Sequence, residues 1–260
     1  MSGTAGPMGE TTCVRGESFV VSGAGGDVTP GTDQGFYVRD TRFLSGLVLH
    51  VDGEAVPPLH GGVTGPGTAT FHGFVRPARS RAVDPVVSVV RRRVVDDGLH
   101  EDVLVSNHGS ELVHLAVAFH AAADFAYVFD VKQGRQHGPA PPVDARRLRF
   151  VRPGGEESTE FDPSPPAVRH GSSVQWDVVL EPHTSTRLCV DVSVRDEYGT
   201  AAPQSRCEAF AHTEGLPSPS SVGPEVRSSE PRMRRLHRRS VDDLGDLTVS
   251  DPQAPGDRFA

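Results

Sequence analysis

Residues 86–121 read VVSVVRRRVVDDGLHEDVLVSNHGSELVHLAVAFHA, and this stretch indicates the fold class most directly. It contains three runs rich in Val and Leu. Asp96-Asp97-Gly98 separates the first run from the second, and Asn107-His108-Gly109-Ser110 separates the second from the third. Asp, Asn and Gly favour turns, whereas β-branched runs of this length favour strands. The stretch therefore predicts a meander of three antiparallel strands.

The third run shows which face of its strand is buried. Alternate residues on one face are apolar, namely Val113, Leu115, Val117 and Phe119. The opposite face is mixed and holds Leu112, His114, Ala116, Ala118 and His120. Because side chains alternate across a strand, the first face is predicted to lie in the core. The second face is predicted to meet solvent or a second layer.

Short runs of the same kind continue on both sides of this stretch. From residue 15 to about residue 200 they alternate with clusters of Gly, Pro, Asp and Asn, and no convincing helix precedes residue 200. The last two runs, 173–180 and 186–194, predict a hairpin through Glu181-Pro182-His183. We therefore expect an all-β chain that forms a large antiparallel β-sandwich, supersandwich-like, over residues 15–200.

The two ends of the chain differ from this pattern. Residues 1–14 are small and polar and are expected to be disordered, and residues 201–229 predict a short helix and a Ser/Pro linker. Residues 230–260 predict a C-terminal linker helix followed by a tail that looks truncated. Five residues of this helix recur at helical spacing: Met233, Leu236, Ser240, Leu244 and Leu247. The other face is basic first and acidic later, which opposes the helix dipole, so we expect the helix to dock on a partner domain.

Composition excludes several classes of function. A chain of 260 residues can bury a core without a metal or disulfide, and its net charge of −8 argues against nucleic-acid binding. Cys13, Cys189 and Cys207 are odd in number and show no CxxC spacing, which predicts reduced thiols rather than disulfides or zinc ligands. The first fifteen residues lack a basic start followed by an apolar run, so no signal peptide is expected, and no apolar stretch approaches the roughly 18–20 residues that would span a bilayer. We expect a cytoplasmic protein with no membrane contact and no cofactor.

The sequence contains no motif that carries catalysis. His100-Glu101-Asp102-Val103-Leu104 begins like the HExxH of zinc proteases but ends in Leu and lies in a predicted strand. Glycosidases use two carboxyl groups roughly 5–10 Å apart, one of them with a raised pKa. The neighbouring acids here lie in a turn, a loop and an exposed helix face: Asp96/Asp97, Glu156/Glu157 and Asp242/Asp243. We therefore expect no catalytic residue and no metal site in this chain.

Residues 35–45, GFYVRDTRFLS, place Arg39, Asp40 and Arg42 between two apolar runs. Charges next to a core are tolerated when they are paired and hydrogen-bonded. The three residues therefore form either a buried brace inside the sandwich or part of a polar rim. Truncating Asp40 separates the two: a brace predicts a large loss of stability, and a rim predicts a change in activity only.

Aromatic residues are the other candidates for a function, because sugar rings stack on them. Trp176 lies in step with Val174 and Val178, which favours a core position, with a glucan-binding surface as the alternative. Residues 123–131, ADFAYVFDV, place acids and aromatics close together around Tyr127. Asp124 or Asp130 is a candidate for an interdomain surface.

Four elements occur in an order that resembles the N-terminal β-domain of bacterial glycogen debranching enzymes of the amylo-α-1,6-glucosidase type. They are the RDTRFLS motif, the RRR…D meander, the "DFAD-x-FEV"-like segment 124–131, and the helix segment RRSVDDL at residues 238–244. The resemblance implies that the β-sandwich precedes an (α/α)6 toroid, which carries the catalytic acids and hydrolyses α-1,6 branch points with inversion. The toroid is absent here, so the chain is expected to be an isolated domain, a truncated gene product or one part of a split protein.

Three functions follow as hypotheses. The first is a non-catalytic domain that packs on an (α/α)6 catalytic domain and shapes its substrate cleft through Arg39, Asp40, Arg42, Asp124 or Asp130. The second is a stand-alone α-glucan-binding module with an exposed ring among Trp176, Tyr127 and Tyr198. The third is a structural interaction domain. The sequence leaves open which glucan is bound and which oligomeric state the chain adopts.

Overall fold

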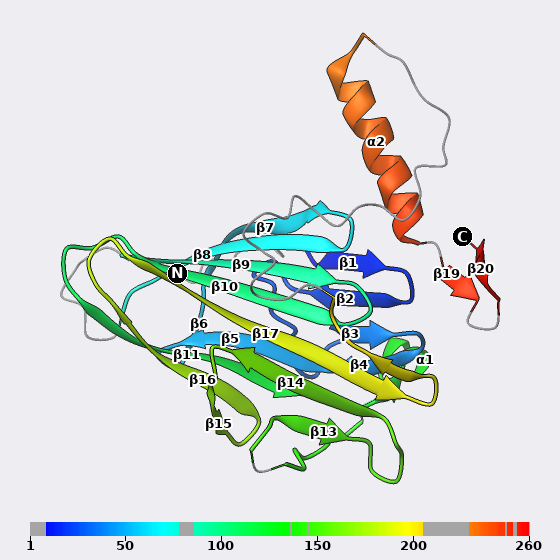
Figure 1. The fold of residues 1–260 in the computed structure, drawn as a ribbon, viewed down its shortest axis with the longest axis horizontal. Helices are drawn as coiled ribbons and strands as arrows, with labels where there is room; N and C mark the ends of the chain where they lie inside the picture. Colours follow the sequence, from blue (N-terminus) through cyan, green and yellow to red (C-terminus); the bar gives the residue numbers. More distant parts are fainter. Residues whose placement is uncertain are drawn as a thin grey trace, which may run out of the picture.

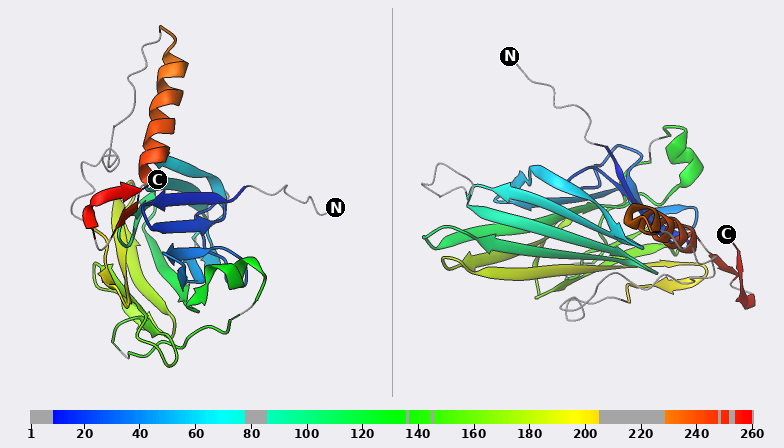
Figure 2. Two further views of the ribbon diagram at one scale, coloured as in Figure 1. Left: turned by 90° about the vertical axis from the view of Figure 1, so that its right-hand side faces the viewer. Right: turned by 90° about the horizontal axis from the view of Figure 1, so that it is seen from above.

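The computed structural model describes residues 9–77, 86–135, 137–144, 146–204, 229–247, 249–251 and 254–259. Strands dominate the described residues and form two facing layers (Figures 1 and 2). The expectation of an all-β chain built as an antiparallel sandwich is confirmed.

One layer is a single eight-stranded sheet in the order β13-β14-β17-β10-β9-β8-β7, with β18 paired to β17. Its strands are β13 (Arg149–Val151), β14 (Ser158–Ser164), β17 (Ser185–Asp196), β10 (Leu99–Asn107), β9 (Val87–Val95), β8 (Thr68–Val75), β7 (Pro58–Gly65) and β18 (Gly199–Ala201). Buried and more exposed residues alternate along β8 and most of β9, as expected of strands with one face on a core.

The other layer is made of two five-stranded sheets. The first has the order β1 (Thr11–Arg15), β2 (Ser18–Ser22), β3 (Gly35–Val38), β4 (Thr41–Leu44) and β12 (Ala126–Tyr127). The second has the order β15 (Val168–His170), β16 (Ser173–Leu180), β11 (Val113–Ala122), β5 (Gly46–Val51) and β6 (Glu54–Ala55). Only Ser45 separates β4 from β5, and the amide of Ser45 donates to the carbonyl of Ala122 at 2.8 Å. The two sheets are therefore adjacent parts of one layer.

The core lies between the two layers. The residues predicted for the buried face of β11 are all buried, and Phe119 and Val117 have no exposed surface. On the opposite face His114 and His120 are exposed. The largest fully buried aromatic side chains come from both layers: Phe36, Phe43, Phe71, Phe119, Phe150 and Phe161. Burial of such apolar area is the main driving force for this fold.

Two of the predicted strand pairings are wrong. β10 pairs with β9 and β17 rather than with β11, and β17 pairs with β10 and β14 rather than with β16. The loops after β10 and after β16 instead carry the chain from one layer to the other, side by side at one end of the sandwich (Figure 1). Asn107 joins these loops, because its side-chain amide donates to the carbonyls of Glu111, Leu180 and Glu181 at 2.8–3.3 Å. The sequence correctly indicates a turn at both positions. The contacts of Asn107 show that each turn connects strands of different layers instead of neighbouring strands of one sheet.

Two helices and a short hairpin complete the described chain. α1 (Val128–Lys132) lies at the end of the sandwich opposite the crossovers, so the expectation of no helix before residue 200 is wrong at this point (Figure 1). α2 (Pro231–Asp246) is the expected linker helix. Glu230 is its N-cap residue, and the Glu230 carboxylate accepts a hydrogen bond from the backbone amide of Arg232. β19 (Val249–Asp251) and β20 (Ala254–Phe259) pair in the tail.

Some expectations about the ends fall outside the described residues. Most of the segment 201–229, where a short helix and a Ser/Pro linker are expected, lies outside the described residues. Residues 1–8 also lie outside them. β1 begins at Thr11, within the segment expected to be disordered. No helix among the described residues has both the length and the apolar character needed to cross a membrane.

Candidate functional site

A buried ion pair between Arg42 on β4 and Asp124, which follows β11, marks the centre of the candidate site. The guanidinium binds the carboxylate through two hydrogen bonds, Nε to Oδ1 at 3.1 Å and Nη2 to Oδ2 at 2.5 Å. Both side chains are almost fully buried. Burial opposes the charge on Arg42, but the hydrogen bond and attraction of Asp124 outweigh it, so the pKa of Arg42 is raised. This is the bidentate geometry that makes arginine–carboxylate pairs strong.

The same guanidinium holds the loop of residues 29–34. Its Nη1 donates to the carbonyls of Thr32 at 2.8 Å and of Gln34 at 3.2 Å. Inside the loop, the hydroxyl of Thr32 donates to the carbonyl of Thr29, and the side-chain carbonyl of Gln34 accepts the amide of Thr29. Tyr37 adds a bond from its hydroxyl to the carbonyl of Asp33 at 2.7 Å. Arg42 therefore fixes this loop relative to Asp124.

The backbone after Asp124 is held in an unusual conformation. Phe125 has a positive φ of 52°, a region that bulky L-residues rarely adopt. Its ring packs edge-on against Phe43 with a centroid separation of 5.9 Å, and its carbonyl accepts a bond from Arg152 at 2.5 Å. Asp124 Oδ1 also accepts the amide of Ala126. Packing and hydrogen bonds thus keep Asp124 directed at Arg42.

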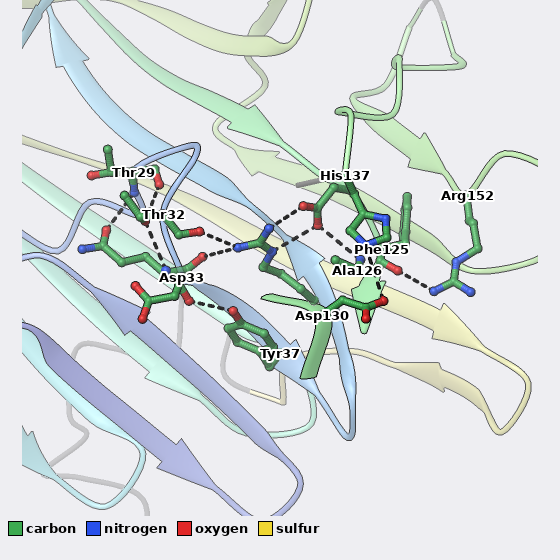
Figure 3. Close-up of polar contacts among 12 residues, drawn as sticks. Thr29, Thr32, Asp33, Tyr37, Phe125, Ala126, Asp130, His137 and Arg152 are labelled. Atoms are coloured by element: carbon green, nitrogen blue, oxygen red, sulfur yellow. Dashed lines mark hydrogen bonds and ion pairs between the residues drawn. The ribbon is translucent and has the colours of Figure 1, made fainter. Parts of the chain in front are cut away.

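A polar cleft of about 440 Å³ opens above this ion pair. One wall is the 29–34 loop, with Thr32 and Asp33, and the other is the segment from α1 to Pro139. Figure 3 shows Thr32 and Asp33 on one side of the contact network and Asp130 and His137 on the other. The cleft is lined by Pro30, Gly31, Thr32, Asp33, Arg42, Ser45, Ala122, Asp124, Val131, Lys132, Gly134, Arg135, His137 and Pro139.

The second wall is organised by Asp130. Its carboxylate accepts a hydrogen bond from Arg135 at 2.7 Å and lies 3.5 Å from Nε2 of His137. Arg135, His137 and Lys132 are exposed to solvent along this wall. The cleft therefore presents cationic donors on one side and the exposed carboxylate of Asp33 on the other.

The predicted cluster of Arg39, Asp40 and Arg42 does not converge on one point. Arg42 forms the buried brace, whereas Asp40 is exposed in the turn between β3 and β4, and its carbonyl accepts the amide of Val128. Arg39 turns away from the cleft: it pairs with Asp196 and Glu17, and its guanidinium lies 4.7 Å from the ring centroid of Tyr198. Arg42 and Asp124 thus line the cleft, Asp130 supports its second wall through Arg135 and His137, and Arg39 belongs to the neighbouring surface.

The aromatic candidates differ in their exposure to solvent. Trp176 is 4% exposed, and its indole N–H donates to the carbonyl of Pro165 at 2.7 Å, so it belongs to the core and its candidacy for sugar stacking is wrong. Tyr127 is 46% exposed and lies beside Phe129, with ring centroids 5.3 Å apart. Lys132 connects this pair to the cleft, because its Nζ lies 5.7 Å from the Phe129 ring centroid.

Four cleft residues were missed from the sequence: Asp33, Lys132, Arg135 and His137. Each lies in a segment that is polar in sequence, so nothing local separates it from an ordinary loop residue. Lys132 gave the one usable signal, because it is the only lysine in the chain. The other three gain significance only through the fold, which brings the 29–34 loop next to the segment after α1.

A second charged cluster is closed inside the core. Glu101 on β10 accepts Nε of Arg91 at 2.8 Å and Nε of Arg93 at 2.5 Å, and all three side chains are buried. Arg91 also binds Asp27 at 2.6 Å, and Arg93 binds Ser22 and the carbonyl of Gly26. This placement supports the rejection of the HExxH interpretation, because Glu101 faces two arginines between the sheets.

The pKa values in this cluster show how its charges are balanced. Burial opposes ionisation of Glu101, but the attraction of Arg91 and Arg93 outweighs it, so the pKa of Glu101 is lowered. Burial also opposes the charge on Arg91, yet Glu101 and Asp27 together raise its pKa. For Arg93, burial and the nearby Arg91 prevail, and its pKa is lowered. The cluster is a compensated group that braces the two layers.

The donor atoms of His100, Asp102 and Cys189 lie within 4.8 Å of one another, the spacing of a metal site. Cys189 is disulfide-bonded, whereas Cys13 is a buried cysteine outside any disulfide. The expectation of three reduced thiols is therefore wrong at Cys189, and its sulfur is not available as a thiolate ligand. Only an imidazole and a carboxylate of this group remain as donors, so the cluster does not match a structural zinc site.

The acid pairs considered for glycoside hydrolysis are engaged in local structure where the chain is described. Asp96 accepts the amides of Gly98 and Gln204 at 3.0 Å, as a turn residue does. Glu157 pairs with Arg152 at 2.9 Å, and Asp243 lies 3.9 Å from Arg239 one helical turn away. These contacts place the acids in a turn, in a surface ion pair and on a helix face, and not in the apolar surroundings that a glycosidase acid occupies.

Fold and site together define an all-β sandwich domain with a polar cleft at one end and charged braces in its interior. Residues 14–191 match the family model described as the N-terminal domain of (some) glycogen debranching enzymes, and the chain belongs to this family. No curated protein matches the chain.

Proposed function

We propose that the chain acts as a non-catalytic domain of a debranching-type glycoside hydrolase and packs on an (α/α)6 catalytic domain. The exposed apolar stripe of α2 carries this proposal. Met233, Leu236 and Leu244 are 53%, 60% and 63% exposed, and Leu247 follows them directly after the helix. Large apolar side chains that gather on one helix face in this way mark a surface that another protein surface covers.

The chemistry of the acids supports a non-catalytic role. In the described part of the chain, Asp124 and Glu101 are buried and bound to arginines, and the attraction of Arg91 and Arg93, which outweighs burial, lowers the pKa of Glu101. An acid catalyst of a glycosidase needs the opposite, an environment that keeps it protonated near neutral pH. Substrate cleavage is therefore assigned to the partner domain, and this chain supplies a surface next to it.

A binding experiment tests the docking. The 260-residue chain is mixed with a purified debranching-type catalytic toroid encoded in the same genome, and complex formation is measured by analytical ultracentrifugation. Leu236→Ser with Leu244→Ser is expected to weaken the complex by tenfold or more, since each buried leucine contributes about 1.5–3 kcal/mol. Arg235→Ser, on the opposite face of α2, is the matched control and is expected to bind as the wild type does. Equal affinity of all three proteins would contradict the proposal.

A stand-alone α-glucan-binding module is the second candidate, and one observation favours it. Tyr127 and Tyr198, two of the three rings considered for sugar stacking, are exposed. The third candidate, a structural interaction domain without a sugar role, predicts no affinity for glycogen. A cytoplasmic location stays a prediction.

A further inference from the structure

We propose that reduction of the disulfide at Cys189 creates a zinc site whose ligands are His100, Asp102 and Cys189. In the oxidised chain the Cys189 sulfur is bound to a second sulfur, and in the reduced chain its thiolate binds Zn²⁺. This inference goes beyond the proposed function, because the three ligands lie in the eight-stranded sheet and the docking surface lies on α2.

The three residues gather on one face of two neighbouring strands. β10 and β17 run side by side in the eight-stranded sheet (Figure 1). Their antiparallel register places Asp102 opposite Cys189 and His100 opposite Asp191. Side chains alternate along a strand, and Glu101 points into the core between the layers, so His100 and Asp102 point to the opposite face. The sheet therefore brings an imidazole, two carboxylates and a sulfur to one patch on its outer face.

The geometry of the group fits a tetrahedral zinc ion. The donor atoms of His100, Asp102 and Cys189 all lie within 4.8 Å of one another. Zinc bonds of about 2.0–2.3 Å place tetrahedral ligand atoms about 3.3–3.7 Å apart, so shifts of about 1 Å close the site. Each of the three residues is at most 4% exposed, which sets this group apart from the exposed acidic groups of a protein surface.

Asp102 is a buried carboxylate whose charge is only partly compensated. Within the described chain its Oδ1 is buried and accepts no hydrogen bond, and its Oδ2 lies 3.7 Å from Nε of Arg187. Burial raises the pKa of Asp102, and the attraction of Arg187 and His100 offsets this rise only in part. A carboxylate in such surroundings is strongly stabilised by a bound cation.

Asp191 orients the imidazole of His100. One oxygen of the Asp191 carboxylate lies 2.5 Å from Nδ1 of His100. Zinc-bound histidines usually donate their other ring nitrogen to a carboxylate or carbonyl, which fixes the ring and its tautomer. Asp191 is therefore a positioning residue, and Nε2 of His100 is assigned as the ligand atom. The Asp191 side chain is 19% exposed, so the patch borders solvent and an ion has an entry path.

The redox state decides whether the sulfur ligand is present. A dithiol such as dithiothreitol transfers two electrons to the Cys189 disulfide, so that two protein thiols form and the dithiol becomes a cyclic disulfide. Zn²⁺ then replaces the proton of the Cys189 thiol, because the thiolate is the ligand form. The second cysteine released by reduction, or a water molecule, takes the fourth position. The same sulfur thus binds either another sulfur or zinc.

Zinc titration of the 260-residue chain in two redox states tests the site. One sample is oxidised, and the other is reduced with dithiothreitol and desalted under nitrogen. Isothermal titration calorimetry is expected to show one Zn²⁺ site in the reduced chain, with an affinity roughly a hundredfold or more above that of the oxidised chain, because only the reduced chain offers a thiolate. Co²⁺ is the spectroscopic probe, and the reduced chain is expected to give a sulfur-to-cobalt charge-transfer band.

Ligand variants are measured in the reduced state. Cys189→Ser is expected to raise the Kd for Zn²⁺ roughly a hundredfold or more and to abolish the charge-transfer band, because the thiolate is lost. His100→Gln and Asp102→Asn are each expected to raise the Kd roughly tenfold or more. Asp191→Asn is expected to raise it by about 10–100-fold and to keep the band, as a positioning residue should.

Matched variants at other positions serve as controls. Cys13→Ser removes a buried cysteine that lies outside any disulfide. His114→Gln and Asp177→Asn change exposed residues of β11 and β16. All three controls are expected to keep the wild-type Kd. Urea denaturation shows which variants fold, and the comparison of the two redox states of the wild type decides the case where a ligand variant does not.

The proposal is overturned if the reduced chain binds Zn²⁺ no more tightly than the oxidised chain, or if its cobalt spectrum has no thiolate band. An equal rise in Kd for Cys13→Ser and Cys189→Ser overturns it as well. These measurements need no catalytic toroid, and the α2 variants measure docking separately, so failure of one proposal is distinguished from failure of the other.

Discussion

The core cluster around Glu101 and the cleft-floor pair Arg42–Asp124 use the same chemistry in different places. Both bind an arginine to a carboxylate with almost complete burial. Glu101 lies between the two layers, where its neighbours are further core groups. Asp124 lies where the layer opens, so its pair is covered on one side only and forms the floor of a cleft. A buried ion pair is thus a brace in both places, and its position decides whether it also supports a binding surface.

The largest expected loss of stability follows from Glu101→Gln, which disrupts the core cluster. Glu101→Gln leaves Arg93 buried without its counter-charge and leaves Arg91 with Asp27 alone, which costs about 3–5 kcal/mol of stability. The free energy of unfolding is measured by urea denaturation. Glu160→Gln, which removes the exposed partner of Arg147, is the control and is expected to cost a small fraction of that loss.

Asp124→Ala tests the other member of the comparison. We expect a loss of about 2–4 kcal/mol in the free energy of unfolding, because Arg42 loses its bidentate partner. The loss is expected to be smaller than at Glu101, since water can enter the cleft and reach the freed guanidinium. A variant with wild-type stability would contradict the role of Asp124 as a brace.

Acidification is expected to reduce the stability that the core cluster provides, gradually as the pH falls, whereas Glu101→Gln removes it at every pH. The pKa of Glu101 is lowered from its ordinary value of 4.5 by the attraction of Arg91 and Arg93, which overcomes the opposing effect of burial. Its contribution to stability is therefore fully present above pH 4.5 and is lost as the pH falls through the lowered pKa. The free energy of unfolding of the wild type, measured between pH 6 and pH 3, should fall more steeply than that of Glu101→Gln. Parallel slopes would contradict the coupling.

The fold class was predictable because its signals are local. Runs such as 113–119 alternate with a period of two, and turn residues separate them, so strands and their buried faces follow from neighbouring residues alone. Strand pairing was not predictable in the same way. A turn after β10 is compatible with a hairpin or with a crossover, and the contacts of Asn107 with Leu180 and Glu181, more than 70 positions away, select the crossover.

The site was predictable only where charge stood out against an apolar background. Arg42 and Asp124 attracted attention because each lies next to a buried strand, and the structure joins them. Asp33 and Arg135 lie in loops that look ordinary in sequence, and they face one cleft because tertiary structure brings these loops together. Trp176 shows the reverse error, since its chemistry suggested sugar stacking while its alternation with Val174 and Val178 correctly indicated the core.

The smallest expected effect is at Asp40, which lies two residues from Arg42 in sequence. Its side chain is exposed, and the contact that it makes to α1 runs through its backbone carbonyl, which Asp40→Ala retains. We therefore expect a change of no more than about 0.5 kcal/mol in the free energy of unfolding, as for ordinary surface substitutions. Thermal and urea denaturation beside Asp124→Ala measure it under identical conditions. A loss of several kcal/mol would show that Asp40 belongs to the brace, and the distinction between the exposed turn and the cleft floor would fail.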